Sequence, residues 1–155
     1  MNDDIRLTTN QACRVVDIDP GSLNSHLAAG RFPCLPSTIR GSVRLFNAGD
    51  VLALWLFRTL LGKTPKAKDA GYFACEIAAK ARGRPEAQFI SIVETVIGSR
   101  SVFIFDDIFD PDELKKRDFG APINDVTHFD MKQIREEIAG RVEQELRAKQ
   151  RGSEQ

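Results

Sequence analysis

The chain has 155 residues, of which 42% are hydrophobic and 28% charged, and its 22 Lys and Arg balance its 22 Asp and Glu. This composition is typical of one ordinary globular domain, or of a small domain with an appendage, and argues against a disordered or fibrous protein. No apolar run reaches the roughly 18 residues that span a bilayer, and the polar start MNDDIRLTTN does not resemble a secretory signal, so we expect a cytoplasmic protein without membrane contact.

A short first helix is predicted to begin at Thr8-Thr9-Asn10 and to end near Asp17. The polar triplet offers side-chain oxygens that cap a helix N-terminus, and the apolar residues that follow recur at helical spacing.

A second helix is predicted to follow at once, with Asp19 as its N-cap and Pro20 at its first position. Leu23 and Leu27 lie four residues apart and form its buried stripe, and Gly30 ends it with a left-handed residue. Two short helices joined by a tight turn predict a helix-turn-helix.

Pro and Gly interrupt residues 31–46, which end in the β-favouring run Val43 to Phe46. We therefore expect a loop and a short hairpin there, the predicted wing, with Arg40 near its tip.

Two longer helices are predicted next. Asn47 caps the first, over residues 48–61, and Gly62 closes it; Thr64-Pro65 opens the second, which runs to about Ala81.

The segment Gly83-Arg84-Pro85 marks a boundary, and β-rich runs lie beyond it. Residues 102–105 predict a strand, whereas residues 89–93 fit either a strand or a helix over 85–97, and we favour the helix. Asp110-Pro111 predicts one helical turn.

Asp130 is expected to cap a last amphipathic helix that runs to about Leu146, with residues 147–155 as a frayed tail. Its apolar residues recur at spacings of three and four and form a narrow stripe: Met131, Ile134, Ile138, Val142 and Leu146. Such a stripe is typical of a coiled-coil seam, so we expect it to pair two copies in a homodimer, the alternative being that it packs on residues 86–127 of its own chain.

The predicted fold is mainly α within the α+β class: a winged helix-turn-helix with additional helices, and a small β-containing region that ends in an amphipathic helix. The predicted domains are 5–82 and 86–150, the second with a regulatory or dimerisation role. Residues 1–84 carry 12 Lys and Arg against 7 Asp and Glu, and residues 85–155 carry 10 against 15. A basic first half and an acidic second half favour a DNA-facing module joined to a region that faces away from DNA.

Across residues 5–82 an ordered set of residues resembles the MerR-type DNA-binding domain, and is similar to its excisionase-like branch. The set is Ser22-Leu23, Gly30, Arg44-Leu45-Phe46, Asp50-Val51, Leu54, Phe57 and Gly62. The sequence departs from the family where Arg and two Tyr are usual, since Asn24, Ser25 and His26 stand there. The resemblance implies a sequence-specific, DNA-binding regulator of transcription. The alternatives are an excisionase-type architectural factor or a protein-interaction module on the same scaffold.

The second helix is expected to enter the major groove, with its small polar residues exposed. Asn24 can form a bidentate hydrogen-bond pair with adenine, while Ser22, Ser25 and His26 can form hydrogen bonds with phosphates or base edges. The flanking DNA backbone is assigned to basic residues in and after the wing: Arg31, Arg40, Arg44, Lys63 and Lys66, extended by Arg58 and Lys68. Arg44 has a structural alternative, an ion pair with Asp50.

We expect no enzyme, cofactor or metal site. No Ser/His/Asp or Cys/His arrangement and no Gly-rich phosphate loop is evident, and the acidic run between Asp106 and Asp112 lacks the spacing of a calcium loop. The three cysteines, Cys13, Cys34 and Cys75, are odd in number and widely spaced, so we expect reduced thiols, with Cys34 the most exposed.

Overall fold

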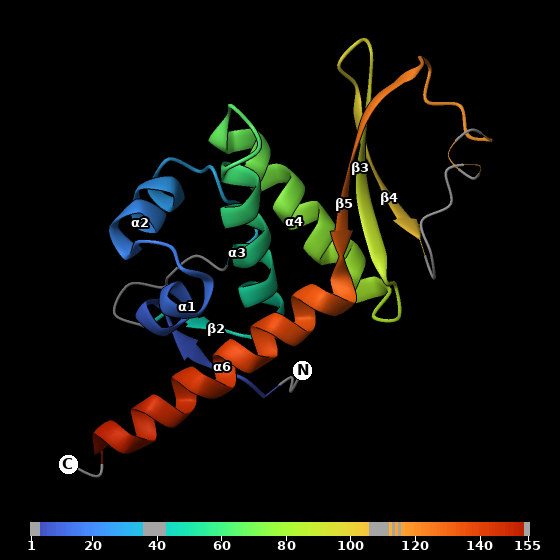
Figure 1. Cartoon of the computed structure of the whole chain (residues 1–155). Helices are drawn as coiled ribbons and strands as arrows, with labels where there is room; N and C mark the ends of the chain where they lie inside the picture. The colour runs from blue at the N-terminus through green and yellow to red at the C-terminus, as the bar shows by residue number, and fades with distance from the viewer. Residues whose placement is uncertain (1–3, 36–42, 106–111, 113, 115, 154–155) are drawn as a thin grey trace. The chain divides into compact units, whose positions relative to one another are not determined.

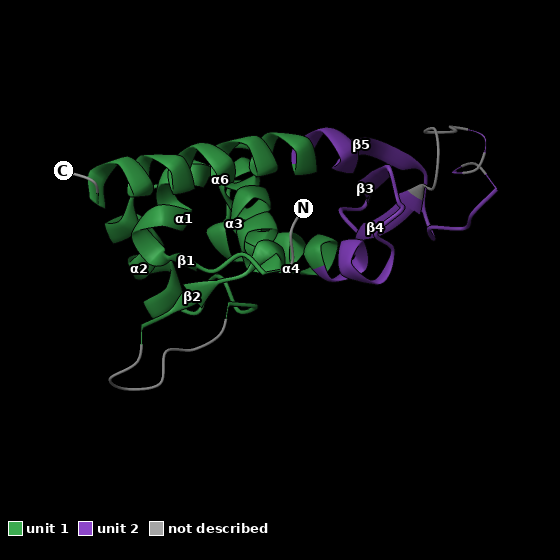
Figure 2. Cartoon of the chain, turned by 90° about the horizontal axis from the view of Figure 1, so that it is seen from below, with its two compact units in different colours: residues 1–78, 135–155 green, residues 79–134 purple. Residues whose placement is uncertain are grey.

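The computed structural model describes residues 4–35, 43–105, 112, 114 and 116–153. The chain divides into two compact units, the first formed by residues 1–78 and 135–155 and the second by residues 79–134 (Figure 2). The sequence suggested a division into 5–82 and 86–150, whereas here the C-terminal residues from 135 onward group with the N-terminal ones. Among the described helices, none is long and apolar enough to cross a membrane.

The chain begins with the two-residue strand β1, Leu7–Thr8, and helix α1, Thr9–Val16 (Figure 1). The N-terminus of α1 is closed by a capping box, in which Thr8 Oγ1 accepts from the Gln11 backbone N–H at 3.3 Å and Gln11 Oε1 accepts from the Thr8 backbone N–H at 2.9 Å. Asp17 ends α1 in the left-handed conformation with φ 65°. The predicted first helix is confirmed at both ends.

Helix α2 runs from Pro20 to Ala28, and its cap is the predicted one. The carboxylate of Asp19 accepts from the backbone N–H of Ser22 at 2.9 Å. Gly30 has a φ of +68°, as expected of the residue that turns the chain out of a helix. The two consecutive short helices predicted from the sequence, α1 and α2, are therefore present, and the winged helix-turn-helix stays a prediction.

Strand β2, Leu45–Phe46, pairs antiparallel with β1, with Leu7 opposite Phe46 and Thr8 opposite Leu45. The expected partner was a strand inside residues 31–46, but the described partner is the start of the chain. The predicted hairpin tip, with Arg40, lies outside the described residues.

Helix α3, Ala48–Leu61, has the predicted bounds, and its N-terminus is closed by a second capping box, between Asn47 and Asp50. Helix α4, Ala67–Gly83, begins and ends about two residues later than predicted. α1 packs against both α2 and α3. Fully buried side chains of β1, β2 and these three helices form the core of the first unit: Leu7, Val16, Leu23, Phe46, Leu54, Leu56, Phe57 and Leu60.

The second unit contains an antiparallel sheet of order β4-β3-β5: β3 is Phe89–Thr95, β4 Arg100–Phe105 and β5 Ile123–Asp130. The predicted helix over 85–97 is therefore wrong, while the predicted strand over 102–105 is confirmed. β3 is the central strand, and residues on both of its faces are buried, for example Ile92 and Val93. A strand buried on both faces loses the alternation that marks strands, so its pattern also fits a helix. The predicted turn at 110–111 lies outside the described residues.

Helix α6 runs from Met131 to Ser153, and Asp130 Oδ1 accepts from the Gln133 N–H at 3.0 Å at its start. The predicted frayed tail is thus wrong as far as Ser153. Most of the apolar stripe is covered within the chain, since Met131, Ile138 and Val142 are buried and Leu146 is 39% exposed. The homodimer stays a prediction. A wholly exposed apolar stripe would have supported it, but most of this stripe is buried within the chain.

Candidate nucleic-acid interface

The exposed face of α2 consists of small polar residues. Leu23 is fully buried, whereas Ser22, Asn24 and Ser25 are exposed, as predicted. Because these three side chains are short, a DNA groove can approach the helix closely, and the Asn24 amide can both donate to and accept from a base edge. The Asp19 carboxylate already accepts a hydrogen bond from the backbone N–H of Ser22 in the first turn. Phosphate contacts are therefore better supplied by Arg and Lys than by the N-terminus of α2.

His26 is less exposed than the sequence suggested, because its ring packs on the core. The ring meets that of Phe57 edge-on, with the centroids 5.2 Å apart. Its Nδ1 lies 3.2 Å from Nη1 of Arg31. Since a guanidinium only donates, Nδ1 must be the acceptor, which leaves the ring proton on Nε2. Burial and, to a smaller extent, the Arg31 charge lower the pKa of His26, so the ring is a neutral acceptor that orients Arg31.

The segment after α2 is held between α3 and α4. The Phe32 ring stacks on that of Phe57, with centroids 4.6 Å apart and an interplanar angle of 7°. On the other side, a Cβ added at Gly71 would lie 1.6 Å from the carbonyl oxygen of Arg31. Only glycine permits so close an approach, so Gly71 fixes where Arg31 emerges from the unit.

Arg44 stands directly before β2 and is half-buried. Its Nε is buried and has no hydrogen-bond partner. In the described part of the chain it makes no ion pair with Asp50, whose Oδ2 accepts instead from the backbone N–H of Asn47 at 3.0 Å. The structural alternative proposed for Arg44 is therefore wrong.

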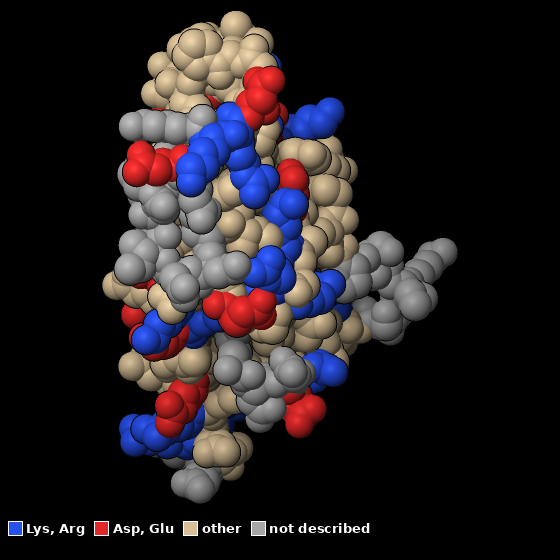
Figure 3. Space-filling view, turned by 90° about the vertical axis from the view of Figure 1, so that its right-hand side faces the viewer, with Lys and Arg blue, Asp and Glu red and all other residues tan. Residues whose placement is uncertain are grey.

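The other predicted basic residues come from different elements. Lys63 and Lys66 are exposed on the connection between α3 and α4, and Arg40 lies outside the described residues. Figure 3 views the molecule from the right-hand side of Figure 1, away from α2, and shows Lys and Arg side chains intermixed with Asp and Glu side chains. Of the predicted site residues, the structure brings His26 and Arg31 into contact and places Ser22, Asn24 and Ser25 on one helix.

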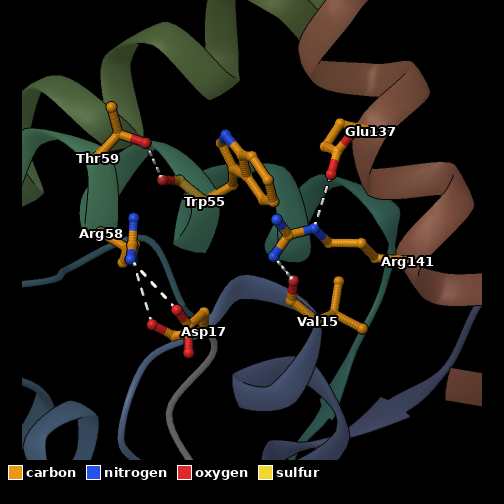
Figure 4. Close-up of polar contacts among 7 residues, drawn as sticks. All are labelled: Val15, Asp17, Trp55, Arg58, Thr59, Glu137 and Arg141. Atoms are coloured by element: carbon orange, nitrogen blue, oxygen red, sulfur yellow. Dashed lines mark hydrogen bonds and ion pairs between the residues drawn. The ribbon is translucent and has the colours of Figure 1, made fainter.

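Two arginines hold the turn between α1 and α2, and the sequence did not reveal either role (Figure 4). Arg58, on α3, donates from Nε to the Asp17 carbonyl at 3.2 Å and pairs with its carboxylate at 3.4 Å. Arg141, on α6, donates to the Val15 carbonyl at 3.2 Å, pairs with Glu137 at 2.9 Å, and lies over the ring of Trp55 at 4.9 Å from its centroid. The last carbonyls of a helix lack intrahelical partners, so Arg141 acts as a C-terminal cap supplied from a distant segment.

The expectation of three reduced thiols is also wrong. Cys34 and Cys75, which are 41 positions apart in the sequence, form a disulfide, and their Cα atoms are 5.6 Å apart. Only Cys13 is free, and it is buried. Counting cysteines did not reveal the pair, because it depends on α4 passing beside the segment that follows α2.

No protein-family model matches the chain, and no curated protein sequence matches it. Within the described residues, no group of three or more His, Cys, Asp and Glu side chains is placed to hold a metal ion. The case for a function therefore depends on the geometry of the first unit.

Proposed function

We propose that this chain is a sequence-specific DNA-binding regulator of transcription, which reads the major groove with α2 and contacts the flanking phosphates with the basic residues around it. One observation carries the proposal. α2 buries Leu23 completely and exposes Ser22, Asn24 and Ser25, and it is the second of two consecutive short helices. In proteins that use this pair on DNA, the second helix lies in the groove and its N-terminal residues lead.

The division of labour follows from the side chains. Asn24 would pair bidentately with an adenine, while Ser22 and Ser25 would bond to phosphates or base edges. Arg31, positioned by His26, would contact a phosphate beside the groove. The arginine contacts at the α1–α2 turn favour this role, because a recognition helix must be held at a fixed angle to the rest of its unit.

The test begins with selection of binding sites from a randomised duplex library, followed by fluorescence anisotropy at several salt concentrations. Asn24→Ala is expected to relax preference at one base pair, at a cost of about 1–3 kcal/mol for the preferred base. Gln144→Ala is the matched control, since it removes an exposed amide from α6 and should leave the site profile unchanged. Binding without any sequence preference in the wild type, or identical profiles for the two variants, would refute the reading role of α2.

A second candidate is a protein-interaction module, and the residues around β2 favour it. Val43 is 74% exposed and Leu45 47% exposed. Large apolar side chains exposed next to each other often mark a protein contact. Leu45→Lys separates the two candidates. If the surface around Leu45 lies against DNA phosphates, the added charge should preserve or strengthen DNA binding. If the surface binds a protein, the added charge should abolish binding of that protein.

A further inference from the structure

The segment that follows α2 is attached to α4 at two neighbouring points. Gly71 meets the Arg31 carbonyl by close packing, and Cys75, one helical turn further along the same face, is bonded to Cys34. The first attachment depends on shape and the second on a covalent bond. Only the second attachment, the disulfide, can be broken by reduction and formed again by oxidation.

The two cysteines of this bond are accessible, unlike the third. Cys34 is exposed and Cys75 is half-buried, whereas Cys13 is 1% exposed. Burial is also the main reason why the pKa of Cys13 is raised, which makes its thiol unreactive. Exposed disulfides are the ones that small thiols reduce readily, in contrast to buried structural ones.

We propose that the Cys34–Cys75 bond is a reversible redox link, whose reduction releases residues 33–35 from α4 while Arg31 and Phe32 stay in place. Phe32 remains stacked on Phe57, and Gly71 still receives the Arg31 carbonyl, because neither contact involves sulfur. Leu35, 8% exposed, is the buried side chain that the release would free.

The reaction is a thiol–disulfide exchange with a small dithiol as reductant. One thiolate of the dithiol attacks the Sγ of Cys34, the Cys34–Cys75 bond breaks, and Cys75 leaves as a thiolate. The second thiolate then attacks the dithiol's own sulfur in the mixed disulfide and releases Cys34. The dithiol is oxidised to a cyclic disulfide and two protein thiols form, a transfer of two electrons; a cyclic or linear small-molecule disulfide drives the reverse.

The consequence for DNA depends on the proposed function. Residues 33–35 directly follow Arg31 and Phe32, so the link limits the conformational freedom of the chain next to a proposed phosphate contact. We expect the oxidised form to bind DNA roughly three- to ten-fold more tightly than the reduced form.

The experiment equilibrates the full chain in mixtures of reduced and oxidised dithiothreitol and measures three quantities. Alkylation in denaturant followed by mass spectrometry counts thiols, which should rise from one to three while circular dichroism shows a folded chain. Hydrogen exchange of the peptide 33–35 should speed up in the same range, while that of α3 should not. DNA affinity, measured last, should fall with the same midpoint.

Two variants complete the design. Cys75→Ser should show the reduced-form exchange under all conditions, and Cys13→Ala should switch like the wild type. A thiol count that stays at one until the chain unfolds, or equal exchange of peptide 33–35 in the two forms, would overturn the redox link. Absence of DNA binding in both forms would refute the proposed function instead, because the first two readouts decide the link without DNA.

Discussion

Replacing Arg141 by Ala tests whether the contacts of α6 contribute to the free energy of unfolding of the first unit. Arg141 makes three contacts, to the Val15 carbonyl, the Glu137 carboxylate and the Trp55 ring. A hydrogen bond from a charged donor contributes about 1.5–3 kcal/mol, and a cation over an aromatic ring about 0.5–1 kcal/mol at an exposed site. Because the side chain is 40% exposed, we take the lower part of these ranges and expect the free energy of unfolding to fall by about 2 kcal/mol.

Arg147→Ala is the matched control for this change. Arg147 lies on the same helix and makes the same kind of ion pair, with the glutamate four residues before it, but it is 68% exposed. Such pairs contribute about 0.3–0.5 kcal/mol, so the two variants should differ by about 1.5 kcal/mol. Urea unfolding followed by circular dichroism measures both values. Equal losses for the two variants would show that the contacts with Val15 and Trp55 do not hold α6 in solution.

Three shorter predictions concern binding, pH and assembly. Arg40→Ala and Arg44→Ala should weaken DNA binding across all sequences and flatten its salt dependence, with melting temperatures measured alongside to detect a loosened fold. The pKa of His26 is lowered by burial, so the unfolded chain binds the proton more readily. Stability should therefore be full above the ordinary pKa near 6.5 and fall as the pH drops toward the folded-state value. His26→Gln should reduce that loss in acid unfolding curves and leave the share of His128, whose pKa burial also lowers. For assembly, sedimentation should show a dimer that Leu146→Glu converts to a monomer; a dimer that survives the change would place the contact elsewhere.

The elements that the sequence predicted best are those whose ends are decided locally. The N-caps of α1, α2 and α3 are Thr8, Asp19 and Asn47, and the side chain of each accepts a hydrogen bond from the first turn of its own helix. Such a cap involves residues within three positions of one another, so it can be recognised without knowledge of the fold. The exposed face of α2 followed in the same way from the burial of Leu23.

What the sequence did not predict depends on contacts between distant segments. The pairing of β1 with β2 joins residues 7–8 to 45–46, the disulfide joins Cys34 to Cys75, and Arg141 reaches α1 across 126 positions. β5 was missed altogether, because residues 123–126 are exposed or half-buried and its sequence shows little apolar alternation. Pairing with the central strand β3 makes it a strand.

The grouping of α6 with the first unit also changes the electrostatic argument for DNA binding. Residues 1–78 and 135–155 together carry 14 Lys and Arg against 12 Asp and Glu, a net of +2, in place of the +5 counted over residues 1–84. Much of the charge on α6 is already paired within the unit, as in Arg14 with Glu145 at 2.6 Å. The attraction to DNA must therefore come from a few local cations and not from the net charge of the unit.

The number of cations that contact DNA phosphates can be measured from the salt dependence of the binding constant. The sequence assigns Arg31, Arg40, Arg44, Lys63 and Lys66 to phosphates and extends this set by Arg58 and Lys68, and each neutralised phosphate contributes about −0.9 to the slope of log K against log salt concentration. One copy of the chain should thus give a slope of about −4.5 from the first five residues, and no steeper than about −6.3 with all seven. Double Lys63→Ala and Lys66→Ala substitution should reduce its magnitude by about 1.8 if both residues touch the backbone. A slope near −9 would mean that two copies bind together, and a slope near zero would refute phosphate contact by these residues and, with it, the proposed mode of DNA binding.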